Sequence, residues 1–389
     1  MNLRQLFLQH VAQTSTTPLA LEIIKAEGCV LTDVKGKNYI DLIGGISVAN
    51  IGHRHAEVIE AINQQLENYL HIMVYGEFVQ SPQVQYARLL TEHLPPTLNS
   101  VYFTNSGAEA IEGAMKLSKR ATGRTEIIAF NKSYHGSTQG ALSIIGDEHW
   151  RNSFRPLLPG IRHLSYNSFD DLEFISDQTA SVIAETVQGE AGVIAPQKEW
   201  ITALQKRCKE TGSLFILDEI QAGFGRTAKL WGFEHFEIVP DILILGKALG
   251  GGMPLGAFIA EKNLMHQLTE NPVLGHITTF GGHPVCCAAG MAAFNVLLKN
   301  DFDIFRKEGQ FKLLLQHAKI KSVRSFGLWM AIEFDSFETC KKIIDYCIEN
   351  GVLTDWFLFA PNCLRISPPL TISPQQVQNA CEVILSALG

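Results

Sequence analysis

The fold is decided by two stretches of the chain, Leu214-Phe-Ile-Leu-Asp-Glu-Ile-Gln221 and Ile242-Leu-Ile-Leu-Gly-Lys-Ala-Leu-Gly-Gly-Gly252. In each stretch a short apolar run stops abruptly at polar residues or glycine, as in a fully buried strand that ends at a loop. Residues 101–103, 127–130 and 182–184 are runs of the same kind, and helical stretches lie between the runs. This alternation predicts an α/β fold with a large, mostly parallel sheet covered by helices on both faces.

The two ends of the chain follow a different pattern from this middle part. Residues 29–33 and 39–42 flank Gly36 as in a β-hairpin. The alternation stops near residue 300, after which short strands and helices suggest a small α+β domain. We therefore expect three segments, which are an N-terminal arm with part of the small domain at 1–50, the large domain at 51–300 and the C-terminal small domain at 301–389.

The composition excludes several classes of protein. The chain has 389 residues, of which 46% are hydrophobic and 18% charged, so it is too apolar for a disordered or fibrous protein. The net charge of −7 and the lack of a basic block in the sequence argue against a dedicated nucleic-acid binder. The apolar surplus predicts a large interior or an extensive subunit interface.

The sequence also indicates the compartment. The eight cysteines show no CxxC spacing and lie in apolar runs, which is typical of buried thiols in a reducing compartment. The first eleven residues carry Arg4 and have helical spacing rather than the pattern of a signal peptide. The longest uncharged stretch, 276–298, is interrupted at 281–284 and is too short to span a bilayer. We predict a cytoplasmic protein.

Ligands of open α/β sheets bind beyond the carboxyl ends of the strands, so the residues that follow each predicted strand are candidates for a site. After residues 101–103 the chain runs through Ser106, Gly107 and Ala108 into a helix. Backbone N–H groups at a helix N-terminus suit a phosphate. Ser106 is equally well explained as an ordinary N-cap.

Further chemistry follows the other strands. Asp218 and Glu219 end one apolar run, where they are either functional acids or helix caps, and Lys247 lies among glycines after another. Tyr134 follows the run at 127–130. An amine that can form a Schiff base, an acid for a pyridinium nitrogen, an aromatic ring and a phosphate cradle are what pyridoxal phosphate (PLP) requires. The chain lacks the glycine-rich fingerprints of dinucleotide and P-loop sites.

On these residues the chain resembles the class III PLP-dependent aminotransferases of fold type I, a family that includes ornithine, acetylornithine and 4-aminobutyrate aminotransferases. The resemblance runs from about Gly28 to about Pro374. The motifs that carry it are Asn105-Ser-Gly-Ala-Glu-Ala110, Tyr134-His-Gly136, Glu185-Thr-Val-Gln-Gly-Glu190, Asp218-Glu-Ile-Gln221, Gly223-Phe-Gly-Arg226, Gly246-Lys-Ala-Leu-Gly-Gly-Gly252 and Thr279-Phe-Gly-Gly282.

The resemblance implies a role for each residue around the cofactor. Lys247 would hold PLP as a Schiff base and then transfer protons, and Asp218 would pair with the pyridine nitrogen. Gln221 would bind the phenolic oxygen and Tyr134 would stack on the ring. Ser106, Gly107 and Ala108 would hold the phosphate, together with Thr279 of the other subunit. A homodimer with shared sites is therefore implied.

Other positions that match the family concern the substrate and the surroundings of the cofactor. Arg365 corresponds to the arginine that binds a substrate carboxylate, and Glu190 to the glutamate that pairs with it. Thr278 is counted with them as substrate-binding. The implied reaction moves an amino group from an ω-amino donor of the ornithine or N-acetylornithine type to 2-oxoglutarate. Glu185 and Arg226 match positions near the cofactor, either as functional residues or as a buried support pair.

One departure from the family leaves the donor open. Relatives that act on ornithine or acetylornithine usually have an arginine directly after the aromatic-X-Gly triplet, whereas this chain has Ser137. A serine cannot replace a guanidinium that reads a carboxylate. Another basic residue could take that role, or the donor could lack the carboxylate, like putrescine. 4-Aminobutyrate is a further candidate donor.

Two further alternatives concern the class of reaction. An aminomutase or racemase on the same scaffold is one alternative, although a pair such as Glu190 and Arg365 favours a transferase with two substrates. A non-catalytic binding protein is the other, and the presence of Lys247 and Asp218 argues against it. His53 and His55 are interpreted as structural, and no metal site is expected.

Overall fold

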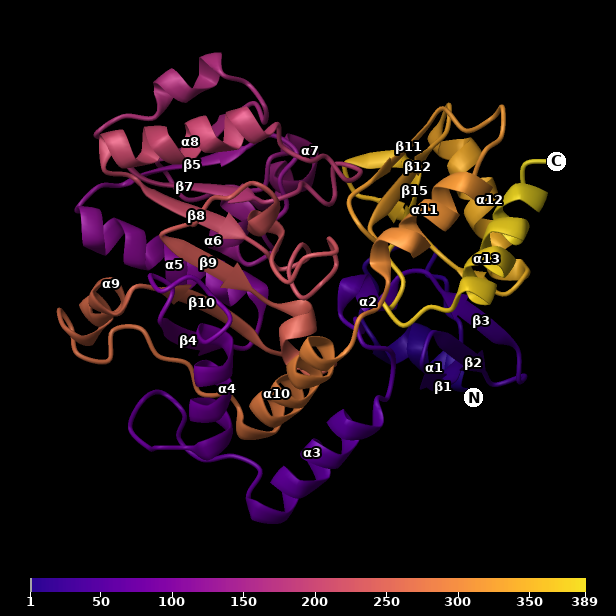
Figure 1. Cartoon of the computed structure of the whole chain (residues 1–389), viewed down its shortest axis with the longest axis horizontal. Helices are drawn as coiled ribbons and strands as arrows, with labels where there is room; N and C mark the ends of the chain where they lie inside the picture. Colours follow the sequence, from indigo (N-terminus) through magenta and orange to yellow (C-terminus); the bar gives the residue numbers. More distant parts are fainter. Residues whose placement is uncertain (1) are drawn as a thin grey trace.

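The computed structural model describes residues 2–389, and its largest element is a seven-stranded sheet. The strand order is β4-β10-β9-β8-β7-β5-β6 (Figure 1). Neighbouring strands pair in parallel except at β10, which is antiparallel to both β4 and β9. The bounds are β4 (Ser100–Thr104), β5 (Glu126–Phe130), β6 (Ile161–Leu164), β7 (Thr179–Glu185), β8 (Leu214–Asp218), β9 (Ile242–Leu245) and β10 (Gly256–Ala260).

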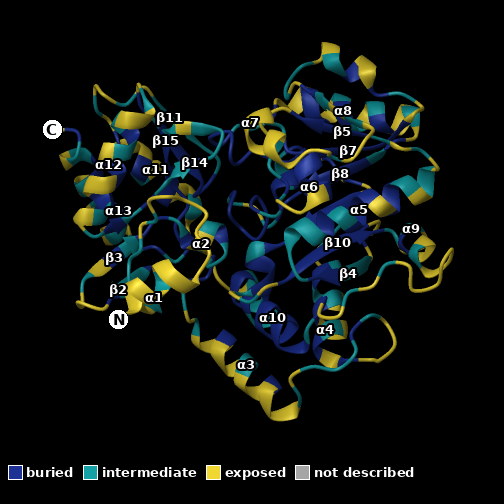
Figure 2. Ribbon diagram, turned by 180° about the vertical axis from the view of Figure 1, so that it is seen from behind, coloured by how far each residue is buried: buried dark blue, intermediate teal, exposed yellow. Residues whose placement is uncertain are grey.

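Helices cover both faces of this sheet because alternate residues of its strands point to opposite sides. Ile216 of β8 packs in one apolar cluster with α5 (Gly107–Thr122). Its neighbours Phe215 and Leu217 pack in the other cluster, which contains α8 (Lys198–Thr211). The central strands are accordingly buried throughout (Figure 2). The remaining helices of this part are α3 (Ala56–Asn68), α4 (Ser81–Thr91), α6 (Gln139–Ser143), α7 (Glu148–Arg151), α9 (Lys262–His266) and α10 (Pro284–Lys299).

Two smaller sheets make up the rest of the molecule. One has the order β1-β2-β3-β13 and the other β11-β12-β15-β14. β13 pairs in parallel with β3, so residues from both chain ends share one sheet. The elements are α1 (Leu3–His10), β1 (Ile23–Glu27), β2 (Val30–Asp33), β3 (Asn38–Asp41), α2 (Gly44–Ser47), α11 (Ile304–Leu314), β11 (Ser322–Ser325), β12 (Met330–Glu333), α12 (Phe337–Glu349), β13 (Val352–Leu353), β14 (Trp356–Phe357), β15 (Ala360–Ile366) and α13 (Pro374–Ser386).

The predicted fold class is confirmed, as a large, mostly parallel sheet with helices on both faces and a smaller α+β part built from both chain ends. The structure adds the antiparallel strand β10, which the alternation of strands and helices did not indicate. The exact division at 1–50, 51–300 and 301–389 stays a prediction.

All eight cysteines are buried and none forms a disulfide, as their apolar surroundings predicted. No helix within residues 2–389 combines the length and the apolar character that crossing a membrane requires.

Candidate active site

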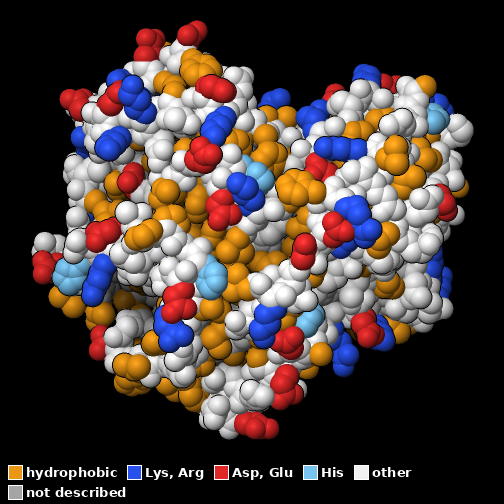
Figure 3. Space-filling view, viewed as in Figure 1, with side chains coloured by type: hydrophobic (Ala, Val, Ile, Leu, Met, Phe, Trp, Pro, Cys, Tyr) orange, Lys and Arg blue, Asp and Glu red, His pale blue; other side chains and the backbone are white. Residues whose placement is uncertain are grey.

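A pocket opens at the carboxyl edge of the large sheet, where β7, β8 and β9 end and α5 begins. The structure brings most of the predicted cofactor residues together there. The pocket is lined by Gly107, Ala108, Tyr134, His135, Gly136, Ser137, Glu185, Val187, Asp218, Ile220, Gln221, Ala222 and Lys247. A hollow separates the two parts of the molecule, and hydrophobic side chains gather around it (Figure 3).

The start of α5 is built to receive an anion. Ser106 is the N-cap, and its hydroxyl accepts a hydrogen bond from the Glu109 N–H at 3.2 Å. The N–H groups of Gly107 and Ala108, which precede it in the first turn, have no partner inside an α-helix. A Cβ on Gly107 would lie 2.4 Å from Ile220 Cδ1, so a larger residue there would require the Ile220 side chain to shift. Backbone donors and the helix dipole together suit a phosphate.

The two carboxylates that end β8 have different tasks. Asp218 faces the pocket, where its Oδ2 lies 2.8 Å from Nδ1 of His135, and its Oδ1 accepts the Ile220 N–H at 2.9 Å. The Glu219 carboxylate instead accepts hydrogen bonds of 2.7 Å from the Thr186 hydroxyl and two backbone N–H groups. Burial raises the pKa of Glu219 to about 7. Glu219 therefore braces the loop, and Asp218 is left for chemistry.

Lys247 supplies the amine of the pocket. It begins the short helix η4 (Lys247–Gly250) with a φ of +48°, a conformation that is uncommon outside glycine and concentrates at functional sites. Burial is the largest influence on its pKa and lowers it to about 8, while the Glu190 and Asp218 carboxylates oppose the shift. Near neutral pH the unprotonated, nucleophilic fraction of this amine is therefore far larger than that of an ordinary lysine.

Three further side chains complete the walls. The Glu185 carboxylate accepts the N–H groups of Tyr134 at 2.9 Å and Gly189 at 2.8 Å. Burial and the nearby Asp218 carboxylate raise the pKa of Glu185 well above its ordinary value. Gln221 Oε1 and His135 Nε2 are buried and have no hydrogen-bond partner among the described residues. Buried polar atoms of this kind are expected to meet a ligand or water.

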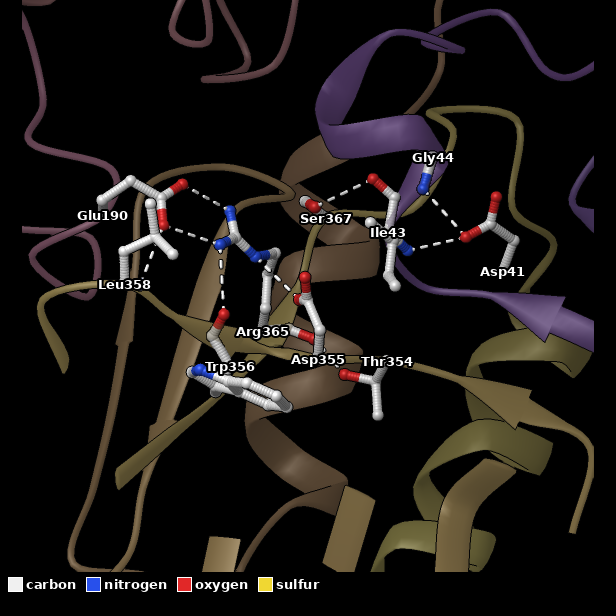
Figure 4. A network of polar contacts seen from close by, with 10 residues as sticks. All are labelled: Asp41, Ile43, Gly44, Glu190, Thr354, Asp355, Trp356, Leu358, Arg365 and Ser367. Carbon is white, nitrogen blue, oxygen red and sulfur yellow. Dashed lines mark hydrogen bonds and ion pairs between the residues drawn. The ribbon is translucent and has the colours of Figure 1, made fainter. Parts of the chain in front are cut away.

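A second polar centre joins Arg365 of β15 to Glu190 of the loop after β7 (Figure 4). The Arg365 guanidinium donates to both oxygens of Glu190, at 2.9 Å and 2.8 Å, and only 3% and 5% of the two side chains are exposed. Burial opposes ionisation of Glu190, but the Arg365 charge prevails and lowers the Glu190 pKa. Both charges of the pair act on the Lys247 amine, which places the pair and the lysine within electrostatic reach of each other.

Arg365 has a second carboxylate partner, which the sequence analysis did not select. Its Nε donates to Asp355 Oδ1 at 2.8 Å. Asp355 lies between β13 and β14, ten residues before Arg365 in the chain. Its only sequence signal is a lone acid in an otherwise uncharged stretch, 350–364.

Several predicted residues lie apart from this pocket. Thr279 is exposed, and the Thr278 hydroxyl accepts the Gly281 N–H at 2.6 Å. Arg226 is fully buried and donates to two backbone carbonyls and Asn50, while both Glu185 oxygens accept backbone N–H groups. The interpretation of Glu185 and Arg226 as a support pair is therefore wrong. His53 Nε2 lies 2.7 Å from Asp41, in a structural contact.

A nucleophilic lysine and an anion cradle in one pocket are typical of enzymes that act through a phosphorylated carbonyl cofactor. The family model for class-III aminotransferases matches residues 11–388, and the chain belongs to that family.

The relatives agree with this assignment. The acetylornithine aminotransferase of Methanopyrus kandleri is 37% identical over 97% of this chain and 96% of its own. That of Bacillus subtilis is 38% identical over 95% of each chain. A solved ornithine aminotransferase from Toxoplasma gondii, described as having PLP at partial occupancy in its active site, superimposes with a TM-score of 0.91 at 29% identity, over 98% of this chain and 92% of its own.

Proposed function

We propose that this aminotransferase uses PLP to move an amino group from an ω-amino donor of the ornithine or N-acetylornithine type to 2-oxoglutarate, giving an aldehyde and glutamate. The observation that carries the proposal is the buried pair of Glu190 and Arg365 near Lys247. The activities named for the relatives support the same reaction. They also disfavour the aminomutase and racemase alternatives.

The residues of the pocket fit PLP. The N–H groups of Gly107 and Ala108 would hold the phosphate, beside the cap residue Ser106, and Asp218 would pair with the pyridine nitrogen. The Gln221 amide, which lines the pocket, would donate an N–H to the phenolic oxygen. Tyr134 would cover the ring. When bound, PLP supplies the electron sink that stabilises charge at the substrate carbon.

The protein's own groups perform the proton transfers and the positioning. As a free amine, Lys247 would remove a proton from the substrate carbon as a general base. As an ammonium group, it would then donate a proton as a general acid. Asp218 favours the protonated form of the pyridine nitrogen because an adjacent carboxylate stabilises the positive charge. His135 orients Asp218 through the 2.8 Å contact.

The pair of Glu190 and Arg365 would let one pocket serve two substrates. With the pair closed, Arg365 is neutralised, and a donor reacts through its distal amine. With Glu190 displaced, the two outer nitrogens of Arg365 can bind a carboxylate of 2-oxoglutarate bidentately. The displacement exchanges one carboxylate for another, so the charge around Arg365 stays balanced in both half-reactions.

We also propose a homodimer in which Thr279 of one subunit completes the phosphate site of the other. Thr279 is exposed on its own chain, and apolar side chains next to it are exposed too, such as Ile277 and Phe280. The ring of Phe280 lies 4.7 Å from His71, which brings the segment around residues 70–79 to the same surface. Val79 in that segment is 93% exposed. Apolar exposure on this scale is typical of an interface.

Mixing inactive Lys247→Ala subunits with weakened Thr279→Ala subunits tests the shared site. Lys247→Ala subunits and Thr279→Ala subunits should form hybrid dimers in which one site carries both changes and the other carries neither. At equal concentrations about half of the dimers are hybrids, so about a quarter of wild-type activity should return. Thr279→Ala alone should bind PLP more weakly, as measured by equilibrium dialysis. A fully active monomer in sedimentation experiments would refute the proposal.

The identity of the donor depends on what takes the place of the missing arginine. Ser137 lines the pocket, and Lys247 is the one lysine or arginine among the lining residues of this described chain. A donor with an α-carboxylate would therefore need a cation from elsewhere, including the other subunit. A donor without that carboxylate would need none. A cytoplasmic location stays a prediction in either case.

A donor screen tests the proposed function. With 2-oxoglutarate as acceptor, glutamate formation should be detected with at least one of ornithine, N-acetylornithine, 4-aminobutyrate, putrescine and lysine. If the subunit interface supplies the missing cation, ornithine or N-acetylornithine should exceed putrescine by roughly tenfold or more in kcat/KM, because an unmatched carboxylate is costly to bury. A protein that forms no glutamate with any of these donors would contradict the proposal.

A further inference from the structure

The Arg365 guanidinium is held from two sides by two carboxylates with different origins (Figure 4). Glu190 binds its two outer nitrogens and comes from the loop after β7, a distant part of the chain. Asp355 accepts from Nε at 2.8 Å and lies directly before β14, the strand that pairs with β15. The backbone also links them, because the Arg365 N–H donates to the Asp355 carbonyl at 2.8 Å.

The different origins of Glu190 and Asp355 determine which contacts Arg365 keeps when Glu190 is displaced. Asp355 directly precedes β14, which pairs with the strand of Arg365, so Asp355 stays beside the guanidinium when the Glu190 side chain turns away. That turn breaks the two contacts of Glu190 with Arg365 and the hydrogen bond that its Oε2 accepts from the Leu358 N–H at 3.0 Å, while the Glu190 backbone stays bound to Phe359. The contacts that then remain on the guanidinium are Asp355 Oδ1, the Trp356 carbonyl at 3.3 Å and the ring of Phe357 at 4.3 Å from the guanidinium carbon. Of these, Asp355 makes the one short, charge-assisted hydrogen bond.

We propose that Asp355 is a positioning residue that keeps the Arg365 guanidinium oriented for the acceptor carboxylate while Glu190 is displaced by the acceptor. This inference rests on the proposed function. Because Glu190 and the acceptor carboxylate replace each other, the repulsion between Asp355 and a carboxylate on Arg365 is present in both states and largely cancels. The orienting effect of Asp355 on the guanidinium does not cancel, because Glu190 holds the guanidinium only in the closed state.

Asp355 should therefore matter for the acceptor and not for the donor. Calorimetry of the PLP-loaded protein with glutarate, a dicarboxylate that cannot be aminated, measures binding at Arg365 without turnover. Asp355→Ala should weaken glutarate binding about tenfold, a modest share of a charge-assisted hydrogen bond. Asp355→Ser, whose hydroxyl is too short for Nε, should show the same loss. Asp355→Asn keeps an oxygen for Nε and should stay within about threefold of wild type.

Steady-state kinetics then separate positioning from a general loss of structure. KM for 2-oxoglutarate should rise about tenfold in Asp355→Ala, while kcat and the donor KM change less than about threefold. Asp345→Asn is the matched control, because Asp345 also pairs with a cation, Lys341 at 2.6 Å, but on the half-exposed surface of α12. This control should leave both binding and kinetics unchanged.

Two results distinguish a failure of the role of Asp355 from a failure of the proposed aminotransferase function. Glu190→Gln should tighten glutarate binding, because it removes the carboxylate that competes for Arg365. If glutarate binds neither wild type nor Glu190→Gln, the proposed function fails. The proposed role of Asp355 alone is overturned by either of two results, given that Glu190→Gln tightens glutarate binding. In the first, Asp355→Ala and Asp355→Ser bind glutarate within twofold of wild type. In the second, both variants weaken donor binding and acceptor binding equally.

Discussion

Lys247→Ala should abolish turnover and leave PLP bound without a covalent bond. Lys247 is the amine of the pocket, and burial lowers its pKa to about 8, so it is suited both to attack a carbonyl and to move protons. Proton transfer by a positioned group alone contributes about 10²–10⁴-fold. We expect kcat to fall at least roughly a thousandfold, which corresponds to ~4 kcal/mol. Borohydride treatment should attach the cofactor permanently to wild type and not to the variant.

The control for this experiment is Lys262→Ala, which changes an exposed lysine at the start of α9. That variant should keep its covalent cofactor and its activity. The gel-filtration volume and thermal melting of Lys247→Ala should stay close to those of wild type, since the lysine makes no hydrogen bond or ion pair among residues 2–389 that its loss would break. A Lys247→Ala protein with a covalent cofactor and near-normal kcat would remove the basis of the proposed mechanism.

The sequence alone predicted that Asp218, Lys247 and the start of α5 gather at one pocket, because each of them has a local pattern. Asp218 and Lys247 each follow an apolar run, and strands of a parallel sheet end at a common edge. The start of α5 was predicted in the same way, by small residues before a helical period. The division of tasks between Asp218 and Glu219 was not predictable, because it depends on hydrogen bonds to Gly232 and Phe233, which follow a later turn.

The contacts of Arg365 show where local patterns stop being informative. Its pairing with Glu190 joins residues 175 positions apart, and it was expected only through the resemblance to a family. Asp355 was not expected, because a single acid in an apolar segment has no periodicity that would show its partner. It meets Arg365 through the register of β14 on β15, where Trp356 lies opposite Leu364. Strand register of this kind depends on packing across the whole sheet rather than on neighbouring residues.

The same limit applies to Thr279. A single chain leaves this threonine exposed, so its place in a site can be decided only by an assembly. The sequence carried one physical hint of that assembly, the surplus of apolar residues. The structure locates part of this surplus on the surface, in the exposed side chains of Val79, Ile277 and Phe280.

Asp218→Asn should lower kcat severely while keeping the fold. Asparagine has nearly the same shape, and its amide oxygen can still accept the Ile220 N–H that Asp218 binds at 2.9 Å. It carries no charge, however, so the protonated pyridine nitrogen loses its counter-ion and the ring becomes a poorer electron sink. We expect a loss of at least roughly a hundredfold, ~2.7 kcal/mol, with the cofactor still attached to Lys247.

Asp241→Asn provides the comparison for this last experiment. Asp241 precedes β9 and accepts the Phe215 N–H of β8 at 2.8 Å, so it contacts the same strand at the end away from the pocket. Its replacement removes a carboxylate charge that contacts the opposite end of β8 and should leave kcat within about threefold of wild type, because no reacting group lies there. Stopped-flow absorbance of the donor half-reaction measures both variants. Equal losses would mean that the charge supports only the sheet, whereas a loss confined to Asp218→Asn ties the rate to the carboxylate that faces Lys247 and His135.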